Sequence, residues 1–563
     1  MHFDDLQSLP TFPATRQPTR EEILFVPLGG SGEIGMNLNL YGHDESWIGI
    51  DCGISFAGPD LPGIDVVLPD HTFMEQLGTR MQAMIITHAH EDHLGALVYL
   101  WHSTDWPIYA TRFACEVLKG KLAREGFEPD GRIHELDLDT SWKIGPFELE
   151  LLVLNHSIPE PNAVIIRTAA GTVMHSGDWK IDPQPGVGKP IDEQALVKLG
   201  QSGVDALVCD STNAMEAGWS RSEGDVQQSL AALIQSLSGT VAVTCFASNI
   251  ARLKSLGEIA AKNGRKPILA GPALSRMAAI AQKCGYLGTQ QFQPSAQFSQ
   301  IPSEERLVIC TGSQGEPNAA LMRIANGSHR DIRLRPDDHV VFSSRVIPGN
   351  EQRVAALQNQ LIYRGIHIHQ AGHETDIHAS GHPNQEELAA MYGWIKPQIA
   401  VPVHGEARHQ LAHAKLAKFC QIPKTILPSN GGVYRLACAG ADDGDYGAIG
   451  QVQAGKMLLD GDCLIESQSP AIAERRKLAL QGCVMVAIAD GELPKSLPRI
   501  GLSVLGIELE KDEVSELERL VQHHNVGRND ASLVQSIKKA LRHRVRELTG
   551  KKPLIEVHIL HLD

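Results

Sequence analysis

Residues 88–93 bring four potential metal ligands together at the end of an expected strand. The segment reads His88-Ala89-His90-Glu91-Asp92-His93 and directly follows an apolar run at 84–87. A tight turn there can point His88 and His90 to one metal ion, and Asp92 and His93 to a second. Imidazole and carboxylate groups suit Zn²⁺, and paired metal ions suit attack of hydroxide on a phosphate ester. The spacing therefore favours a two-metal hydrolytic centre over a histidine-rich loop without metal.

Three further candidate ligands lie far along the chain, each just past an apolar strand: His156, Asp178 and His404. An open sheet presents its ligands at such strand ends. A single His or Asp in this position is more often a turn residue or a helix cap. Three of them in this order favour ligands. Asp51 also ends an apolar strand, and we expect it to support the histidine loop by hydrogen bonds rather than to bind metal.

The HxHxDH spacing is similar to the signature of the metallo-β-lactamase superfamily. That resemblance implies two Zn²⁺ ions, with Mn²⁺ or Mg²⁺ as possible substitutes. It assigns one zinc to His88, His90 and His156, the other to Asp92, His93 and His404, and makes Asp178 the bridge. Either Asp92 or Asp178 is then expected to orient the attacking hydroxide.

Length and net charge limit the number of domains and the kinds of partner that the chain can have. With 563 residues, the chain is too long for one core, so two to four domains are expected. The net charge of -15 argues against a nucleic-acid partner, but bound metal ions add positive charge that this count ignores. A basic run at 538–546 is read as a solvated helix face rather than as a specific RNA contact.

The cysteines and the amino terminus predict a cytoplasmic protein. Ten cysteines are scattered without a CxxC pair, which is typical of reduced thiols and not of a disulfide framework. No apolar run reaches the ~20 residues of a membrane span. The first residues contain acids and prolines and lack the apolar core of a signal peptide.

The order of expected strands and helices predicts an α/β protein with a domain inserted into the metal-binding domain. Regular βαβ alternation runs through the middle of the chain and indicates a parallel sheet with helices on both faces. Because His404 follows this segment, the chain must return to the metal site. We expect an amino-terminal extension at 1–20, the metal-binding αββα sandwich at 21–208 and 366–438, the insertion at 209–365, a glycine-rich linker at 439–464 and a small α/β domain at 465–563.

The inserted segment resembles the β-CASP group of nucleases within that superfamily. Asp210, His378 and His404 match the three motifs that this group adds. In DNA-processing relatives the third position is typically aliphatic, so a histidine there points to RNA. The resemblance implies that His378 is the general acid for the leaving 3′-oxygen and that Asp210 holds its tautomer. Asp210 can alternatively be a helix N-cap.

Three longer stretches, at 27–37, 311–317 and 343–351, resemble the bacterial ribonuclease J family. The resemblance implies a 5′→3′ exonuclease that prefers 5′-monophosphate ends and also cuts internally. Its substrate would be single-stranded RNA, including rRNA precursors, in RNA maturation and decay. A homodimer or homotetramer through the carboxy-terminal domain is implied, as are partners in RNA degradation.

The segment around Ser380 predicts a grip for a phosphate group. Glycine allows close backbone approach, and serine and histidine donate to anionic oxygens. The expected substrate-binding set is His378, Ala379, Ser380, Gly381 and His382, together with Phe246 and Ser248 at the start of a helix in the insertion. Phe246 would stack on the terminal base; core packing of this ring is an equal alternative.

Three other functions compete with the ribonuclease. A hydrolase of small esters, such as a lactonase or thioesterase, shares the HxHxDH spacing but is expected to lack the long βαβ insertion. A non-catalytic RNA-binding scaffold is expected to have lost ligands, and all seven positions are intact. A DNA-repair nuclease is disfavoured by His404.

Overall fold

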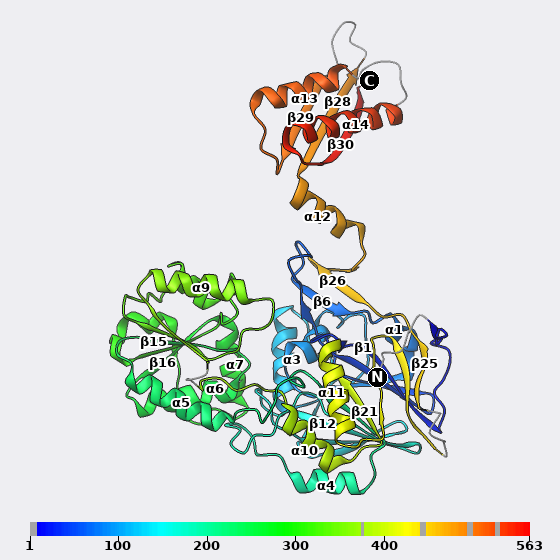
Figure 1. Ribbon diagram of the computed structural model, residues 1–563, viewed down its shortest axis with the longest axis vertical. Helices are drawn as coiled ribbons and strands as arrows, with labels where there is room; N and C mark the ends of the chain where they lie inside the picture. Colours follow the sequence, from blue (N-terminus) through cyan, green and yellow to red (C-terminus); the bar gives the residue numbers. More distant parts are fainter. Residues whose placement is uncertain (1–7, 373–375, 440–445, 492–498, 524–529, 563) are drawn as a thin grey trace. The chain divides into compact units, whose positions relative to one another are not determined.

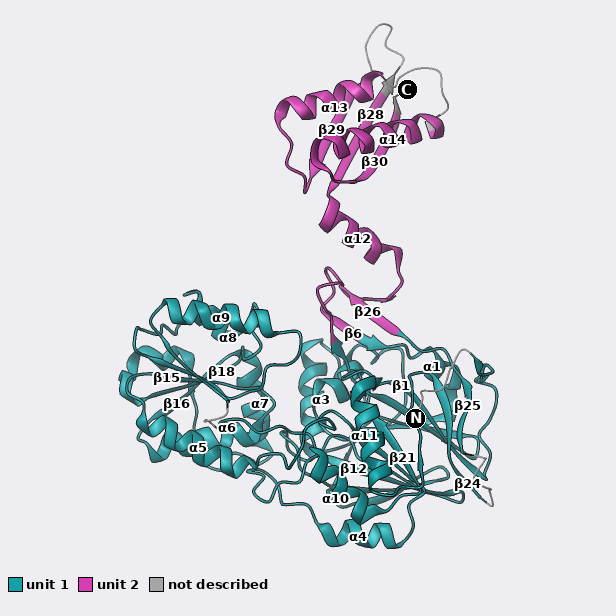
Figure 2. Ribbon diagram, viewed as in Figure 1, with its two compact units in different colours: residues 1–55, 68–455 teal, residues 56–67, 456–563 magenta. Residues whose placement is uncertain are grey.

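A computed structural model describes residues 8–372, 376–439, 446–491, 499–523 and 530–562. The chain divides into two compact units, residues 1–55 with 68–455 and residues 56–67 with 456–563 (Figure 2). The first unit holds the metal-binding sandwich and the inserted domain (Figure 1). Within the described residues, no helix combines the length and apolar character needed to cross a lipid bilayer.

Two mixed sheets form the centre of the metal-binding domain. The first has the order β25(Gly447–Gln451), β24(Gly432–Cys438), β1(Glu22–Gly29), β3(Leu38–His43), β4(Ser46–Ile50), β7(Met81–Ile85), β8(Ile108–Thr111) and β9(Ile133–Leu136). The second has the order β10(Ser141–Ile144), β11(Phe147–Val153), β12(Asn162–Thr168), β13(Gly171–His175), β14(Ala206–Asp210), β21(Ile399–Val403) and β23(Lys424–Thr425). The two sheets face each other across a core that includes Phe25, Ile48, Leu149 and Val164.

Helices cover the outer face of each sheet, which completes the expected αββα layers. Under the second sheet lie α4(Glu193–Gln201), α10(Gln385–Ile395) and α11(Ala407–Phe419), and Met174, Leu207 and Tyr392 belong to the apolar cluster there. On the first sheet, α1(Thr72–Leu77) packs through the edge-to-face pair Phe73–Trp47. The burial of Val, Ile and Leu on both faces explains why the central strands read as continuous apolar runs.

The inserted domain is built on a six-stranded sheet whose neighbouring strands run parallel. Its order is β17(Gln293–Pro294), β16(Lys266–Ala270), β18(Arg306–Cys310), β15(Val241–Thr244), β19(His339–Phe342) and β20(His367–Gln370). One face is packed by α8(Ala320–Ala325) and α9(Glu351–Tyr363). On the other side lie α5(Glu223–Ser236), α6(Ile250–Lys262) and α7(Pro272–Lys283) (Figure 1). The predicted parallel sheet with helices on both faces is confirmed.

Two predicted boundaries differ from the structure. The insertion extends beyond residue 365, because β20 pairs with β19 at the edge of its sheet. Residues 439–464 are not simply a linker: β25 adds to the first sheet, and β26(Lys456–Asp460) pairs with β27(Cys463–Glu466). The glycine-rich part at 440–445, which suggested the linker, lies outside the described residues. Of the predicted extension at 1–20, residues 1–7 also lie outside, while Phe12 is buried and donates its N–H to Gln451.

The second unit contains two small sheets. The first has the order β27, β26, β6(Val66–Pro69) and β5(Ser55–Phe56). After α12(Pro470–Gln481) come β28(Cys483–Gly491), β29(Arg499–Leu505) and β30(Leu554–Leu562), which form the second sheet. Helices α13(Lys511–His523) and α14(Asp530–Thr549) pack on one face of that sheet, around a core that includes Val484, Leu517 and Leu541. The predicted small α/β domain is confirmed in class.

Candidate active site

The histidine loop is held in place by a buried carboxylate at the end of β4. Asp51 accepts hydrogen bonds from the Thr87 backbone N–H at 2.8 Å and from the Thr87 hydroxyl. Its Oδ2 lies 2.7 Å from Nδ1 of His93. Parallel pairing of Ile50 with Ile85 brings the ends of β4 and β7 together, which places Asp51 beside the loop. The prediction that Asp51 supports this loop is confirmed.

Three histidines and one aspartate form the first group of candidate ligands. Nδ1 of His90 lies 3.1 Å from Nε2 of His88 and 3.0 Å from Nε2 of His156. Oδ2 of Asp178 lies 3.8 Å from both His88 and His156. Burial lowers the pKa of His90 to about 4 and moves those of His88 and His156 in the same direction. The rings are therefore neutral and have free lone pairs, as metal ligation requires.

The second group shares Asp178 with the first. It consists of Asp92, His93, Asp178 and His404. Nε2 of His93 lies 3.2 Å from Asp178, and Nε2 of His404 lies 3.2 Å from Asp92. Burial alone would lower the pKa values of His93 and His404, but the surrounding carboxylates, Asp178 first, raise both well above the usual value. Asp178 thus lies between two clusters of donors whose nitrogen and oxygen atoms suit zinc.

All seven residues predicted as ligands therefore converge, in the two groups that the resemblance implied. The second sheet explains how the later members meet. Parallel pairing sets Asp210 opposite Val403, so His404 follows immediately at the same sheet edge. Asp178 follows β13, which is parallel to β14. His404 has a left-handed backbone (φ +51°), a strained conformation that is typical of functional positions.

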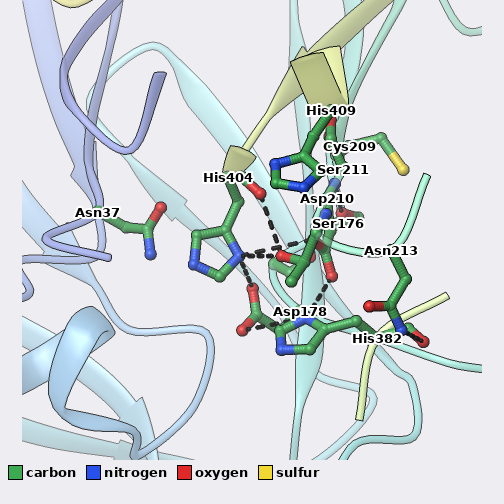
Figure 3. Close-up of polar contacts among 12 residues, drawn as sticks. Asn37, Ser176, Asp178, Cys209, Asp210, Ser211, Asn213, His382, His404 and His409 are labelled. Carbon is green, nitrogen blue, oxygen red and sulfur yellow. Dashed lines mark hydrogen bonds and ion pairs between the residues drawn. The ribbon is translucent and has the colours of Figure 1, made fainter. Parts of the chain in front are cut away.

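Asp210 contacts His382 and not His378. Its Oδ2 lies 2.8 Å from Nδ1 of His382, and the same nitrogen lies 3.8 Å from Asp178 (Figure 3). The prediction that Asp210 orients His378 is wrong. The helix-cap alternative is also wrong, because the other Asp210 oxygen accepts from Thr212 N–H in a turn, and the next helix begins only at Glu223.

His378 instead faces a cavity on the side of the insertion. The carbonyl of Ile377 accepts hydrogen bonds from Arg252 and Ser343, which fixes the backbone before this residue. Burial, followed by the charge of Arg252, lowers the pKa of His378 to about 3. This shift favours the neutral ring, which does not suit the proton-donor role that the sequence suggested, and Asp210 meets His382 instead.

Asn213 holds the segment between His378 and His382. Its Nδ2 donates to the Ser380 hydroxyl at 2.8 Å and to the His382 carbonyl at 3.2 Å. Gly381 passes so close to His156 that an added Cβ would lie 2.5 Å from its ring. The Gly381 carbonyl in turn lies 2.5 Å from Nδ1 of His156. The glycine is therefore needed for close approach to a candidate ligand.

Glu387 is a supporting residue that the sequence analysis missed. Its buried carboxylate accepts from the backbone N–H groups of Ile181, Ser220 and Asn384, each at 2.8–2.9 Å. One side chain thereby joins the segments that follow Asp178, Asp210 and His382. The signal was present, because Asn384 and Glu387 have the spacing of a capping box at the start of α10.

A cavity of about 970 Å³ lies next to this segment. Its lining includes His378, Ser380, Asn213, Trp219 and Arg345, and Trp219 is 58% exposed. Ala379, which belongs to the same segment, is buried. Phe246 and Ser248 are half-buried between β15 and α6, and they are not among the described residues that line the cavity.

Comparison with known families accounts for most of the chain. A beta-lactamase superfamily domain matches residues 46–234, a ribonuclease J beta-CASP domain matches 238–361, and a Zn-dependent metallo-hydrolase RNA specificity domain matches 373–425. The crystal structure of a protein of unknown function from Enterococcus faecalis V583 covers 74% of this chain and all of its own, with 16% identity and a TM-score of 0.52. It shares the fold.

Relatives with the name ribonuclease J align over nearly the full length. The protein from Sinorhizobium meliloti is 41% identical, over 96% of this chain and 97% of its own. Ribonuclease J 1 from Streptococcus pyogenes is 34% identical, over 96% and 98%. The protein from Thermus thermophilus is 32% identical, over 95% of each chain. The chain belongs to the ribonuclease J family and is a metal-dependent ribonuclease.

Proposed function

We propose that the chain hydrolyses RNA phosphodiester bonds with two Zn²⁺ ions, for which Mn²⁺ or Mg²⁺ can substitute. The observation that carries this proposal is the pair of His/Asp groups that share Asp178. When bound, such ions stabilise charge on the phosphate and lower the pKa of a water molecule. His88, His90 and His156 would hold one ion, and Asp92, His93 and His404 the other. Metal analysis of the purified protein, with hydrolysis measured before and after chelation and readdition of each ion, tests this assignment.

His382 is the residue best placed to give a proton to the leaving 3′-oxygen. Its Nδ1 is engaged by Asp210, which leaves Nε2 as the atom that can donate. Burial alone would lower the pKa of His382, but Asp210 and Asp178 raise it, so the protonated ring is favoured. This assignment replaces His378, whose neutral ring lies at the cavity.

We further propose that the cavity beside Ser380 receives the 5′ end of the RNA. Ser380 and Arg345 supply hydrogen-bond donors for a monophosphate, and Trp219 supplies an exposed ring for a base. The enzyme then acts as a 5′→3′ exonuclease that prefers 5′-monophosphate ends, and internal cleavage uses the same catalytic centre without end recognition. Phe246 and Ser248, predicted to contact the terminal nucleotide, are not among the described residues that line this cavity, so Trp219 takes the stacking role in this proposal.

The test is decay of end-labelled RNAs that differ only in the 5′ group. The parent protein should degrade 5′-monophosphate RNA faster than 5′-triphosphate RNA, and Arg345→Gln should reduce the difference. Ser328→Ala, an exposed change elsewhere in the insertion, is the control. If the parent protein degrades 5′-monophosphate and 5′-triphosphate RNA at equal rates, the cavity does not recognise the 5′ end. The proposal for the hydrolytic centre would be unaffected by that result. Matched single-stranded DNA in the same assay tests the preference for RNA.

The carboxy-terminal unit offers a surface for a homodimer or homotetramer. One face of its three-stranded sheet is covered by helices, while the other exposes Met485, Leu505 and Leu560. Light scattering of the parent and of Met485→Lys with Leu560→Lys tests this role. All ten cysteines, which lie in the described part of the chain, are free thiols, in keeping with action in the cytoplasm. There the enzyme would act in RNA decay and rRNA maturation, alone or with RNA-degradation partners.

A further inference from the structure

A second cluster of histidines lies in the inserted domain, at the edge strand of its sheet. His339 begins β19, and His367 and His369 lie on β20. His339 and His367 are register partners, and residues two apart on a strand point to the same face. Three imidazoles therefore share one face of this sheet edge.

Two of these rings have the geometry of ligands to a common ion. Nδ1 of His339 lies 3.2 Å from Nε2 of His369. A tetrahedral zinc with bonds of about 2.0–2.1 Å separates two ligand nitrogens by about 3.3 Å. The separation in the catalytic centre is similar, since Nε2 of His88 lies 3.1 Å from Nδ1 of His90.

The state of the two rings also suits ligation. Both are half-buried, and burial together with the neighbouring imidazoles lowers the pKa of His339 and of His369. The carboxylate of Asp338 raises the pKa of His339, whereas the charge of Arg265 lowers it, as burial does. Both shifts favour the neutral ring that metal ligation requires. Strands hold them at fixed positions, as a metal site requires.

His367 lies beside this pair and would complete the site after a turn of its side chain. Its ring stacks on His339 with centroids 5.1 Å apart, and its side chain is 57% exposed, so it has room to turn. Nε2 of His367 lies 3.5 Å from a carboxylate oxygen of Asp337. A carboxylate beside a ligand histidine raises its basicity and orients its ring.

The cluster is separate from the catalytic centre. His339 and His367 begin their strands, whereas the opposite ends lead toward the active site: Ser343, just past β19, donates to the Ile377 carbonyl. Among the described residues, no hydrogen bond or ion pair joins this cluster to the seven catalytic ligands.

We propose that His339 and His369, with His367 as the third ligand, form a second metal site for a divalent transition ion of the Zn²⁺, Ni²⁺ or Cu²⁺ type. Imidazole nitrogens favour these ions over Mg²⁺ or Ca²⁺. Because β20 is the edge strand and pairs only with β19 among the described strands, a shared ion fastens it to the sheet. The function of the site is structural, and β20 is the strand that leads into the substrate segment around Ser380.

Calorimetric titration with Ni²⁺ tests the proposal on the full-length protein. We compare the parent, a His339→Asn, His369→Gln variant, and a control with two exposed histidines changed, His102→Asn and His543→Asn. The first variant should bind one equivalent less than the parent and the control, and should keep the parent's rate of RNA cleavage. Ni²⁺ should also raise the Tm of the parent more than that of this variant.

A single His367→Asn variant covers the case in which the double change unfolds the domain. This exposed change should weaken the additional Ni²⁺ equivalent at least tenfold without altering the catalytic equivalents. Equal stoichiometry and affinity in the parent and the variants that fold would overturn the proposal. His339 and His369 would then share only an N–H···N hydrogen bond.

Discussion

Nδ1 of His382 lies 2.8 Å from Oδ2 of Asp210, and this pair adjoins Asp178 and His404 (Figure 3). The carboxylate fixes the orientation of the ring and the nitrogen that faces it. Asn213 holds the backbone of His382 from the other side. The geometry gives this histidine a fixed position beside the candidate metal ligands without a place in either metal group that the resemblance assigns.

The first prediction separates the two histidines of the substrate segment. His382→Ala should slow cleavage by roughly 10²–10⁴-fold, the usual contribution of a general acid. His378→Ala should change the rate at saturating RNA far less and should mainly raise KM, because that ring lines the cavity. Single-turnover and steady-state rates for both variants decide between them. If His378→Ala lowers kcat more than His382→Ala does, His378 is the general acid and the assignment to His382 is wrong.

The second prediction concerns the metal ligands. His90→Ala removes a nitrogen that lies 3.1 Å from His88 and 3.0 Å from His156, so hydrolysis should be abolished. RNA binding should persist, because the donors of the insertion are unchanged. Metal content, RNA binding and RNA cleavage, all measured on the same preparation of the variant, test this prediction. If the variant, with its metal content measured, still cleaves RNA at the full rate, the two-metal assignment is contradicted.

The third prediction concerns a buried ion pair in the insertion. Nη2 of Arg252 lies 3.0 Å from Glu223, and Arg252 also donates to the Ile377 carbonyl at 3.2 Å. Arg252→Met leaves a buried carboxylate without its partner and should cost about 3–5 kcal/mol in the free energy of unfolding. Adding Glu223→Leu should recover part of the loss. Urea unfolding of both variants provides the measurement, and a double variant no more stable than the single one would contradict the account.

The fourth prediction concerns acid stability. His413 is buried between the Ser211 hydroxyl and the Tyr392 hydroxyl, and burial lowers its pKa to about 4. The unfolded chain binds this proton more readily, at a pKa near 6.5, so the stabilisation is complete above that pH and is lost as pH falls toward 4.

His413→Gln should therefore lose less stability than the parent between pH 6.5 and 4, by on the order of 3 kcal/mol at most. The control is His102→Gln, at an exposed position. Urea unfolding at several pH values gives both slopes. Parallel slopes for the parent and His413→Gln would show that this ring does not contribute.

Most of the ligand set was predictable because each member follows a strand. His156, Asp178 and His404 each lie just past an apolar run, and the strand ends of the two sheets meet at one edge. The βαβ alternation of the insertion was equally readable from local sequence, because helices such as Ile250–Lys262 and Glu351–Tyr363 each lie between two strands of the parallel sheet.

The errors arose where contacts between distant segments decide the structure. His378 and His382 lie in one short segment, and which of them meets Asp210 depends on Arg252, Ser343 and Asn213, far away in sequence. The region 439–464 contains short strands that form only by pairing with distant partners. Local composition there resembles a linker, because edge strands carry little apolar signal.

The place of His404 after the inserted domain has a consequence for the biosynthesis of the enzyme. Synthesis proceeds from the amino terminus, so this ligand leaves the ribosome after every other member of the centre. Strand β1 must also wait for β24, with which Phe25 pairs through Tyr434. Such high contact order makes closure of the sandwich slow, since the loop entropy is lost before the contacts form. A nascent chain that ends before residue 404 therefore has no complete catalytic centre, and nuclease activity is acquired late in its maturation.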